Sequence, residues 1–268
     1  MNESLIIVVT GASSGIGSAI ARHLAADGHA VYGTSRSAQD QSSFSWLQVD
    51  VMDWDSITKA INQVVEKHGH IDVLINNAGI GMISSLEEAP FENIDQVIDT
   101  NFNGLLRMIK AILPQMRERR SGKIINISSI AGLMGLPYRS IYSASKFAVE
   151  GLTEALRTEV KKFGVQVCTL QPGSINTNIK EKRVSHLPKD SVYNPELMEA
   201  EKLMNEEVAN GIEADAVAEE VARLISTKRL RSKYVVARPF QKTVTLLKRW
   251  LPPSVFERLL MNHYKLGG

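Results

Sequence analysis

The sequence predicts an α/β fold built around one parallel β-sheet, and three observations lead to this prediction. Short apolar, β-branched runs bounded by turn residues alternate with longer stretches of helical periodicity, which is the pattern of βα units. A glycine-rich turn lies between the first of these runs and the first helical stretch. No Gly- or Ser-rich linker divides the 268 residues, of which 44% are hydrophobic, so one domain with a well-buried core is expected.

Regular elements are predicted along most of the chain, with one irregular segment at about residues 178–212. This segment is expected to be a loop with one or two helical turns, and it leaves the carboxyl edge of a strand, where open α/β sheets bind ligands. It is therefore a candidate substrate lid. The predicted strands are Leu5–Thr10, Ala30–Ser35, Trp46–Asp50, Asp72–Asn76, Gly122–Ser128, Val165–Gln171 and Lys233–Val236, and the predicted helices are Gly15–Asp27, Trp54–His68, Phe91–Arg119, Tyr142–Phe163 and Asp215–Thr227.

The chain contains a single cysteine, Cys168, which excludes an internal disulfide and gives no indication of an oxidising compartment. Because Cys168 lies in an apolar run, we expect a core residue rather than a reactive thiol. The N-terminal residues lack the basic segment and cleavage site of a signal peptide, and their apolar run is too short to cross a bilayer. A cytoplasmic protein is expected.

Positive charge is concentrated near the C-terminus, where residues 227–268 contain ten Lys or Arg against Glu257 alone. Residues 240–268 also carry an apolar stripe on two predicted helices, which Pro252 and Pro253 separate. Such a stripe more often packs on the protein's own body or on a neighbouring subunit, but cationic amphipathic helices also lie on anionic membranes. Nucleic acid is not expected as a partner, because no motif that reads it accompanies the charge. The stripe consists of Leu246, Leu247, Trp250, Leu251, Val255, Phe256, Leu259 and Leu260.

The segment TGASSGIG, residues 10–17, follows the first predicted strand and opens the first helix. Its glycines allow a tight turn and a close approach to a pyrophosphate, and the free N–H groups at the helix start attract the negative charge. A P-loop is excluded because no Lys follows the last glycine. The segment therefore predicts a dinucleotide site, although helix caps and sharp turns use the same residue types.

The end of the second strand indicates which dinucleotide is bound. The acidic residue expected there for a ribose 2′-hydroxyl is absent, and Arg36 follows Ser35. A guanidinium binds a 2′-phosphate with two hydrogen bonds, which favours NADP(H) over NAD(H), although Arg36 can also be a solvated loop charge. At the end of the third strand, Asp50 with Val51 is expected to accept a hydrogen bond from the adenine amino group.

Tyr142 and Lys146 are four residues apart in a predicted helix and therefore share one of its faces. There the Lys146 ammonium stabilises the phenolate of Tyr142, which makes the tyrosine a usable acid and base. A serine at the end of the preceding strand, Ser128 or Ser129, can hydrogen-bond the reacting oxygen. A Tyr-x-x-x-Lys pair alone is common on surface helices and becomes informative only together with other motifs.

With these other motifs the chain resembles the short-chain dehydrogenase/reductase family over nearly its full length. The glycine turn matches the family's TGxxxGxG, residues 76–79 its NNAG and residues 142–146 its YxxxK. Asn101 matches the catalytic Asn-x-x-Gly element, and residues 171–177 (QPGSINT) resemble the PGxIxT segment. Ser129 lies 13 residues before Tyr142, the usual interval in the family, and is therefore preferred to Ser128.

The resemblance implies a single Rossmann-type doubly wound sheet of seven parallel strands, in the order 3-2-1-4-5-6-7, with helices on both faces. Residues 1–239 would form the dinucleotide-binding and catalytic domain, and residues 240–268 a basic amphipathic extension. A homodimer or homotetramer is implied, and no metal is expected. The implied catalytic residues are Asn101, Ser129, Tyr142 and Lys146, and the implied cofactor-binding residues are Gly11, Ser13, Ser14, Gly15, Ile16, Gly17, Arg36, Asp50, Val51, Asn77, Ala78, Gly79, Tyr142, Lys146, Pro172, Gly173, Ile175 and Thr177.

The resemblance also implies a role for each catalytic residue in the transfer of a hydride. Tyr142 donates or accepts the proton, and Lys146 supports it while holding the nicotinamide ribose. Ser129 polarises the substrate carbonyl or hydroxyl, and Asn101 orders a water that relays protons through Lys146. Family members that prefer NAD have Asp at the position of Ser35, so this departure supports NADP(H).

An apolar site wall is expected, which suits a small hydrophobic ketone or aldehyde, such as a steroid- or lipid-like compound. Ordinary packing against the sheet explains the same side chains equally well. Two other functions stay open: a lipid- or membrane-associating module that binds a cofactor, and an epimerase or dehydratase of the same family. The apolar side chains are Leu133, Met134 and Leu136 before the tyrosine and Leu187, Leu197, Met198, Leu203 and Met204 in the lid.

Overall fold

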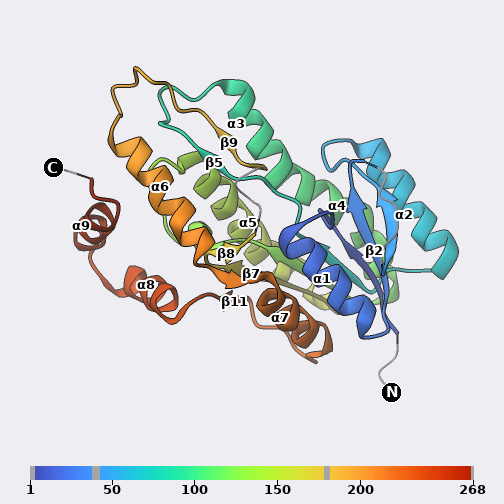
Figure 1. Cartoon of the computed structure of the whole chain (residues 1–268). Helices are drawn as coiled ribbons and strands as arrows, with labels where there is room; N and C mark the ends of the chain where they lie inside the picture. Colours follow the sequence, from blue (N-terminus) through green and yellow to red (C-terminus); the bar gives the residue numbers. More distant parts are fainter. Residues whose placement is uncertain (1–3, 38–42, 178–181, 267–268) are drawn as a thin grey trace.

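The computed structural model describes residues 4–37, 43–177 and 182–266, and these form a central sheet with helices on both faces (Figure 1). The sheet has seven strands in the order β3-β2-β1-β4-β6-β7-β11, and all neighbouring strands are parallel. Counted along the chain within this sheet, the order is 3-2-1-4-5-6-7, which confirms the prediction. The strands are β1 (Ile6–Val9), β2 (Ala30–Ser35), β3 (Ser45–Gln48), β4 (Val73–Asn76), β6 (Gly122–Ile127), β7 (Val165–Pro172) and β11 (Lys233–Val236).

Each central strand is buried on both faces because its side chains alternate between two apolar clusters. In β1, Ile6 and Val8 belong to the cluster under α2, α4 and α5, whereas Ile7 and Val9 belong to the cluster under α1 and α7. This double burial explains why the strands are continuous apolar runs in the sequence. The helices are α1 (Gly15–Ala26), α2 (Trp54–His68), α4 (Gly104–Arg119), α5 (Ser140–Glu159) and α7 (Ala214–Ser226).

The single helix predicted for residues 91–119 is divided in the structure. It consists of α3 (Phe91–Ile98) and α4, joined by the π-helical turn Asp99–Asn103. A π-helical turn adds one residue between hydrogen-bonded partners and is frequent at functional sites. Here it contains the buried Asn101.

The lid prediction was wrong in its secondary structure, because α6 (Glu196–Ala209) is a regular helix of 14 residues. Leu197, Ala200 and Met204 form its buried stripe, and Glu196 and Glu199 lie in its first turn, where the helix dipole favours negative charge. Residues 178–181 of the predicted lid lie outside the described residues. Four short strands that were not predicted pair the ends of this segment with the main domain: β5 (Met82–Ile83) with β9 (Val184–Ser185), and β8 (Ile175–Asn176) with β10 (Ile212–Glu213).

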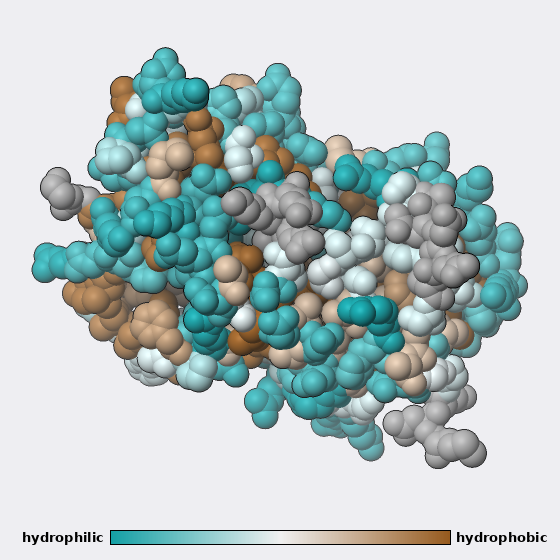
Figure 2. All heavy atoms as spheres, in the orientation of Figure 1, coloured by the Kyte–Doolittle hydropathy of each residue, from teal (hydrophilic) through white to brown (hydrophobic). Residues whose placement is uncertain are grey.

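The C-terminal residues form two helices, α8 (Pro239–Trp250) and α9 (Pro253–His263), as predicted. Part of their apolar stripe packs on the protein's own body, since Phe256 is buried against Met134 and Leu136. Another part is exposed, including Trp250 (79% exposed), and apolar side chains are visible on this part of the surface (Figure 2). Within the described ranges, no helix has both the length and the apolar character needed to cross a membrane.

Cys168 lies in β7 with no exposed surface, and burial raises the pKa of its thiol to about 12. A thiol reacts through its thiolate, so this cysteine should resist iodoacetamide in the native protein at about pH 8 and react after unfolding in urea. Mass spectrometry of the two samples measures the difference. Rapid alkylation of the native protein would contradict the core assignment.

Candidate active site

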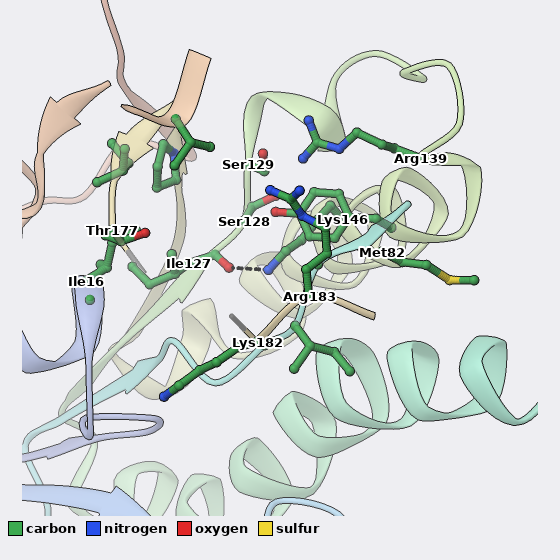
Figure 3. Close-up of a pocket in the computed structure, with 18 of the residues that line it drawn as sticks. Ile16, Met82, Ile127, Ser128, Ser129, Arg139, Lys146, Thr177, Lys182 and Arg183 are labelled. Atoms are coloured by element: carbon green, nitrogen blue, oxygen red, sulfur yellow. Dashed lines mark hydrogen bonds between the residues drawn. The ribbon is translucent and has the colours of Figure 1, made fainter. Parts of the chain in front are cut away.

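A cavity of about 670 Å³ lies at the carboxyl edge of the sheet, where most of the predicted site residues meet (Figure 3). One end is walled by the glycine turn and the ends of β2 and β4, the centre by Ser129, Tyr142 and Lys146, and the other end by α6, α8 and α9. Of the predicted site residues, only Gly17 and Asn101 do not line it. The cavity therefore joins the predicted dinucleotide site to a second, mainly apolar compartment.

The glycine turn has the geometry of a dinucleotide cradle. Gly11 and Gly15 have positive φ angles of 66° and 55°, and a Cβ atom at Gly11 would lie 2.9 Å from Cα of Ala78. Asn77 ties the turn to β4, since its Nδ2 atom donates to the carbonyl oxygen of Thr10 at 3.0 Å. Only glycine fits this path of the chain, and α1 begins directly at Gly15.

Arg36 and Asp50 line the end of the same cavity where the adenosine is predicted to bind. Arg36 is exposed, and its backbone carbonyl accepts from Gln48 Nε2 at 3.2 Å, so the side chain projects from an anchored strand end. Asp50 Oδ1 accepts from the backbone of Met52 at 3.0 Å, which orients the carboxylate. Gly17 serves packing, because a Cβ there would collide with the carbonyl oxygen of Gly11.

Tyr142 and Lys146 lie on α5 where this helix crosses the end of β6. Lys146 is 5% exposed, its Nζ donates to the carbonyl oxygen of Ile127 at 3.0 Å, and it lies 5.9 Å from the centre of the Tyr142 ring. This bond fixes the ammonium at the end of β6, inside the cavity (Figure 3). The predicted Tyr and Lys are thus brought together.

Both serines that follow β6 line the cavity. Ser129 Oγ accepts from the backbone of Ala131 at 3.1 Å and keeps its own proton available for a substrate oxygen. Ser128 Oγ is buried and has no hydrogen-bond partner within the described part of the chain. The geometry alone does not separate the two serines, so the preference for Ser129 continues to rest on its interval from Tyr142.

Asn101 lies behind the cavity wall and is 1% exposed. Its Oδ1 accepts from the backbone of Ile80 at 2.8 Å, and its Nδ2 donates to the Ile80 carbonyl at 2.9 Å and to Ser145 Oγ at 3.1 Å. The side chain thereby fixes the segment after β4 against α5. A water relay through Asn101 stays a prediction.

The segment of residues 172–177 lines the middle of the cavity and is tied to the C-terminal helices. A Cβ at Gly173 would collide with Oε1 of Gln241, and Gln241 Nε2 donates to Ser174 Oγ at 2.9 Å. Gln241 belongs to α8, so this helix is anchored directly beside the predicted nicotinamide site.

The apolar compartment differs in part from the expected wall. Met134, Leu136 and Met204 line it, whereas Leu187 and Leu197 pack in a separate cluster with Ile83, and Leu133, Met198 and Leu203 do not line it. Sequence analysis missed most of the wall, because it comes from the C-terminal helices. These residues are Phe240, Val244, Leu247, Phe256, Leu259, Leu260, His263 and Tyr264.

Three cationic residues of the cavity were also missed. Arg139 precedes α5, and Lys182 and Arg183 precede β9. Lys182 Nζ donates to Ser14 Oγ at 2.6 Å and so reaches the glycine turn from the segment predicted as a lid. No local pattern identifies these residues, because they come together only in the fold.

Comparisons with known proteins agree with this geometry. Residues 5–188 match a family model described as short chain dehydrogenase. The chain belongs to the short-chain dehydrogenase/reductase family.

It is 40% identical to a 3-ketodihydrosphingosine reductase of Bacteroides thetaiotaomicron over 97% of this chain and 98% of that protein. A short-chain dehydrogenase structure from Streptomyces avermitilis has a TM-score of 0.84 at 28% identity and covers 98% of this chain and 97% of its own. A variant of an actinorhodin polyketide ketoreductase, solved with NADPH, has a TM-score of 0.75 at 30% identity, covering 87% and 96%.

As a short-chain dehydrogenase/reductase, the protein is an NAD(P)-binding oxidoreductase that acts on CH–OH groups. The residues present fit the dinucleotide, since the glycine turn opens onto the start of α1 and a Cβ at Gly11 or Gly17 would collide with backbone atoms around the turn. Within the described residues, no group of acidic, His or Cys side chains has the geometry of a metal site. The chemistry that the described residues themselves supply is the positioning of protons beside the dinucleotide.

The C-terminal wall of the site is held by an ion pair, in which His263 Nε2 lies 3.0 Å from Glu207 Oε1. The hydrogen bond to Glu207 raises the pKa of His263 above its ordinary value, although burial opposes this. A raised pKa means that the pair stabilises the fold fully below the ordinary histidine value, and that this contribution is lost as the pH rises through the raised value.

His263→Gln should therefore lower the Tm of the protein more at about pH 6 than at about pH 9. Glu207→Gln should lower it with the same pH dependence, and the double variant should add little to either single change. Thermal unfolding followed by circular dichroism at both pH values measures this. A loss in His263→Gln that is independent of pH would contradict the assignment.

Proposed function

We propose that this protein is an NADP(H)-dependent reductase that interconverts a ketone and a secondary alcohol on a hydrophobic, lipid-like substrate. The observation that carries the proposal is the position of Tyr142, Lys146 and Ser129, which line the cavity between the dinucleotide cradle and the apolar compartment. A carbonyl in this compartment comes within reach of a proton donor and of the cofactor at the same time.

Each residue has one task in this proposal. The bound dinucleotide supplies the hydride, and Tyr142 gives its proton to the carbonyl oxygen. Ser129 donates a hydrogen bond to that oxygen, which stabilises the negative charge that develops there. The Lys146 ammonium favours the phenolate left on Tyr142 because it is fixed by Ile127 about one helical turn away. An epimerase or dehydratase is less well supported, since all four residues of the reductase set are present.

Tyr142→Phe should lower kcat/KM for ketone reduction by about 10²- to 10⁴-fold, because the variant keeps the ring but loses the proton donor. NADPH affinity should stay close to that of the parent. Absorbance of NADPH gives the rate, and protein fluorescence titration gives the Kd. Tyr234→Phe, which changes a hydroxyl bonded to the Arg231 backbone away from the cavity, is the matched control. Undiminished turnover in Tyr142→Phe would overturn the assignment.

The preference for NADP(H) rests on Arg36, which is exposed and lines the adenosine end of the cavity beside Ser35. Because β2 ends in Ser35, it has no acidic side chain there to accept from a ribose 2′-hydroxyl, and the Arg36 guanidinium offers a partner to a 2′-phosphate instead. The relative that was solved with NADPH is consistent with this choice.

We expect the parent protein to bind NADPH more tightly than NADH. Arg36→Ala should weaken NADPH binding about 10- to 100-fold, the usual worth of a hydrogen-bonded charge, and leave the Kd of NADH nearly unchanged. Calorimetric titration measures all four Kd values. Arg22→Ala is the control, because Arg22 is exposed on α1 and bonded only to the Ser18 backbone among the described residues. Equal Kd values for both cofactors in the parent protein would refute the preference.

A lipid-like substrate is supported by the wall from α8 and α9, where Val244, Leu247, Phe256 and Leu259 line one compartment. The relative from Bacteroides thetaiotaomicron is named for the reduction of a long-chain ketone, and the match extends over 97% of this chain. A compartment lined by apolar side chains from two helices favours a substrate with an alkyl chain.

We also propose that α8 and α9 rest on anionic membranes. Leu246 and Trp250 are 61% and 79% exposed, and the exposed cations Lys248, Arg249 and Arg258 lie on the same two helices. Apolar side chains next to cations complement a lipid surface that carries negative charge. Since other residues of these helices line the cavity, a lipid substrate would have a short path from the membrane to the site.

The double variant Leu246→Ser, Trp250→Ser should reduce co-sedimentation with vesicles of phosphatidylcholine and phosphatidylglycerol, and added salt should weaken the binding of the parent. Neither side chain lines the cavity, so loss of binding is separate from loss of turnover. Phe91→Ser, which removes an equally exposed aromatic side chain from α3, is the control. Vesicle binding that is absent in the parent or identical in the double variant would exclude the membrane role.

A further inference from the structure

Two guanidinium groups lie in the substrate compartment, next to the proposed proton donor. The Cζ atom of Arg139 is 4.9 Å from the centre of the Tyr142 ring. Arg183 directly precedes β9, the strand that pairs with β5, and both arginines line the cavity. In Figure 3 both side chains reach toward Ser129. The proposed function gives neither of them a task, because a hydrophobic ketone needs no cation.

The described residues provide no carboxylate within ion-pair distance of either arginine. Arg183 uses one of its five donors in a bond of 2.9 Å to Asn205 Oδ1. Nε of Arg139 is buried and has no hydrogen-bond partner among the described residues. Two positive groups in a partly enclosed cavity, with donors to spare, form a site for an anion.

The electrostatics of the compartment point the same way. Burial lowers the pKa of Arg183, and the charge of Arg139 lowers it further, although the carboxylate of Glu201 raises it. An anion between the two groups would remove this repulsion. The carboxylate of Glu207 lines the same cavity but is already paired with His263. Among the described residues, the compartment thus has two guanidinium groups without an ion-paired carboxylate, and the one carboxylate that lines this end, Glu207, is already paired.

We propose that Arg139 and Arg183 bind an acidic group of the substrate, a carboxylate or a phosphate, close to the carbonyl that Tyr142 protonates. The substrate class is then a long-chain ketone that carries an acid within a few bonds of the carbonyl. Its alkyl chain lies along Met134 and Leu136 toward the wall from α8 and α9. This inference rests on the proposed reductase function and adds the polar end of its substrate.

The proposed substrate differs in charge from the compound in the name of the Bacteroides thetaiotaomicron relative. A 3-ketodihydrosphingosine is a long-chain ketone with an amine beside the carbonyl, and an ammonium next to two guanidinium groups is repelled. An acidic group at the same distance accepts hydrogen bonds from the two planar guanidinium groups, and these bonds also fix the orientation of the carbonyl. The sign of the charge beside the ketone is therefore the property to measure.

The test uses the full-length protein with NADPH and three kinds of ketone with equal chain lengths. The acids are a 2-oxoalkylphosphonic acid, paired with its neutral dimethyl ester, and a 4-oxoalkanoic acid, paired with its methyl ester. The third kind is the amino ketone 3-ketodihydrosphingosine. The acids should have a kcat/KM about 10- to 100-fold above that of their esters, which corresponds to one or two charged hydrogen bonds. Comparison of the phosphonate with the carboxylate identifies the acid.

Arg183→Gln and Arg139→Gln should each reduce the ratio of kcat/KM for acid over ester by about 10-fold or more, mainly through KM. Arg117→Gln is the control, since this arginine is exposed, pairs with Glu118 and does not line the cavity. The Tm of each variant shows whether it folds. Arg183→Lys keeps the positive charge but loses the planar guanidinium, so its ratio of kcat/KM for acid over ester should lie between those of the parent and Arg183→Gln.

The failure of this inference differs from the failure of the proposed function. If acids and esters are reduced equally well, if the amino ketone is preferred, or if the ratio survives both substitutions, the acid site is refuted and the reductase stands. If no ketone consumes NADPH, the reductase is refuted, and calorimetry with undecylphosphonate decides the acid site alone. Binding that Arg183→Gln weakens supports the site, and binding that is absent or unchanged refutes it.

Discussion

The site depends on how α5 is fixed to the end of β6. Lys146 donates to the Ile127 carbonyl at 3.0 Å, and one strand position earlier Asn126 Nδ2 donates to Thr153 Oγ1 at 2.9 Å. Gly132 completes the contact, because any Cβ there would lie 2.9 Å from the Lys146 carbonyl oxygen. These bonds are buried and directional, and therefore set the height and rotation of the helix. Tyr142 reaches the cavity because the helix that carries it cannot shift.

The sheet could be predicted from the sequence because its physical cause is local. A strand buried on both faces must be apolar at every position, as Ile6–Val9 and Val73–Asn76 nearly are, and the helices between such strands have their own period. Helix α6 was predictable too. Pro195 precedes Glu196 and Glu199, and Leu197, Ala200 and Met204 follow at helical spacing. The π-helical turn at Asp99–Asn103 has no comparable local signal.

The residues predicted for catalysis and cofactor binding could be named from the sequence for a different reason, since most of them belong to short motifs. The substrate compartment has no such motifs. Arg139 and Arg183 lie far apart in the sequence, and the walls from α6, α8 and α9 meet the tyrosine only through tertiary packing. Gln241 illustrates the difficulty, because its bonds to Ser174 anchor α8, yet a single glutamine near a C-terminus predicts nothing. Contacts of this kind join residues that are far apart in the chain, so they leave no regular spacing in the sequence from which they could be predicted.

The polar groups of the site and its apolar wall are therefore built by different parts of the chain. The family match covers residues 5–188 and contains Ser129, Tyr142 and Lys146 as well as Arg139 and Arg183. Most of the apolar wall lies beyond residue 188, in helices whose outer surface carries exposed apolar and cationic side chains. A substrate that is held at one end by Arg139 and Arg183 and along its length by α8 and α9 has only one orientation in the cavity. The distance between the acidic group and the carbonyl then determines which carbonyl lies next to Tyr142. The length of the alkyl chain is determined separately, by the apolar wall from α8 and α9.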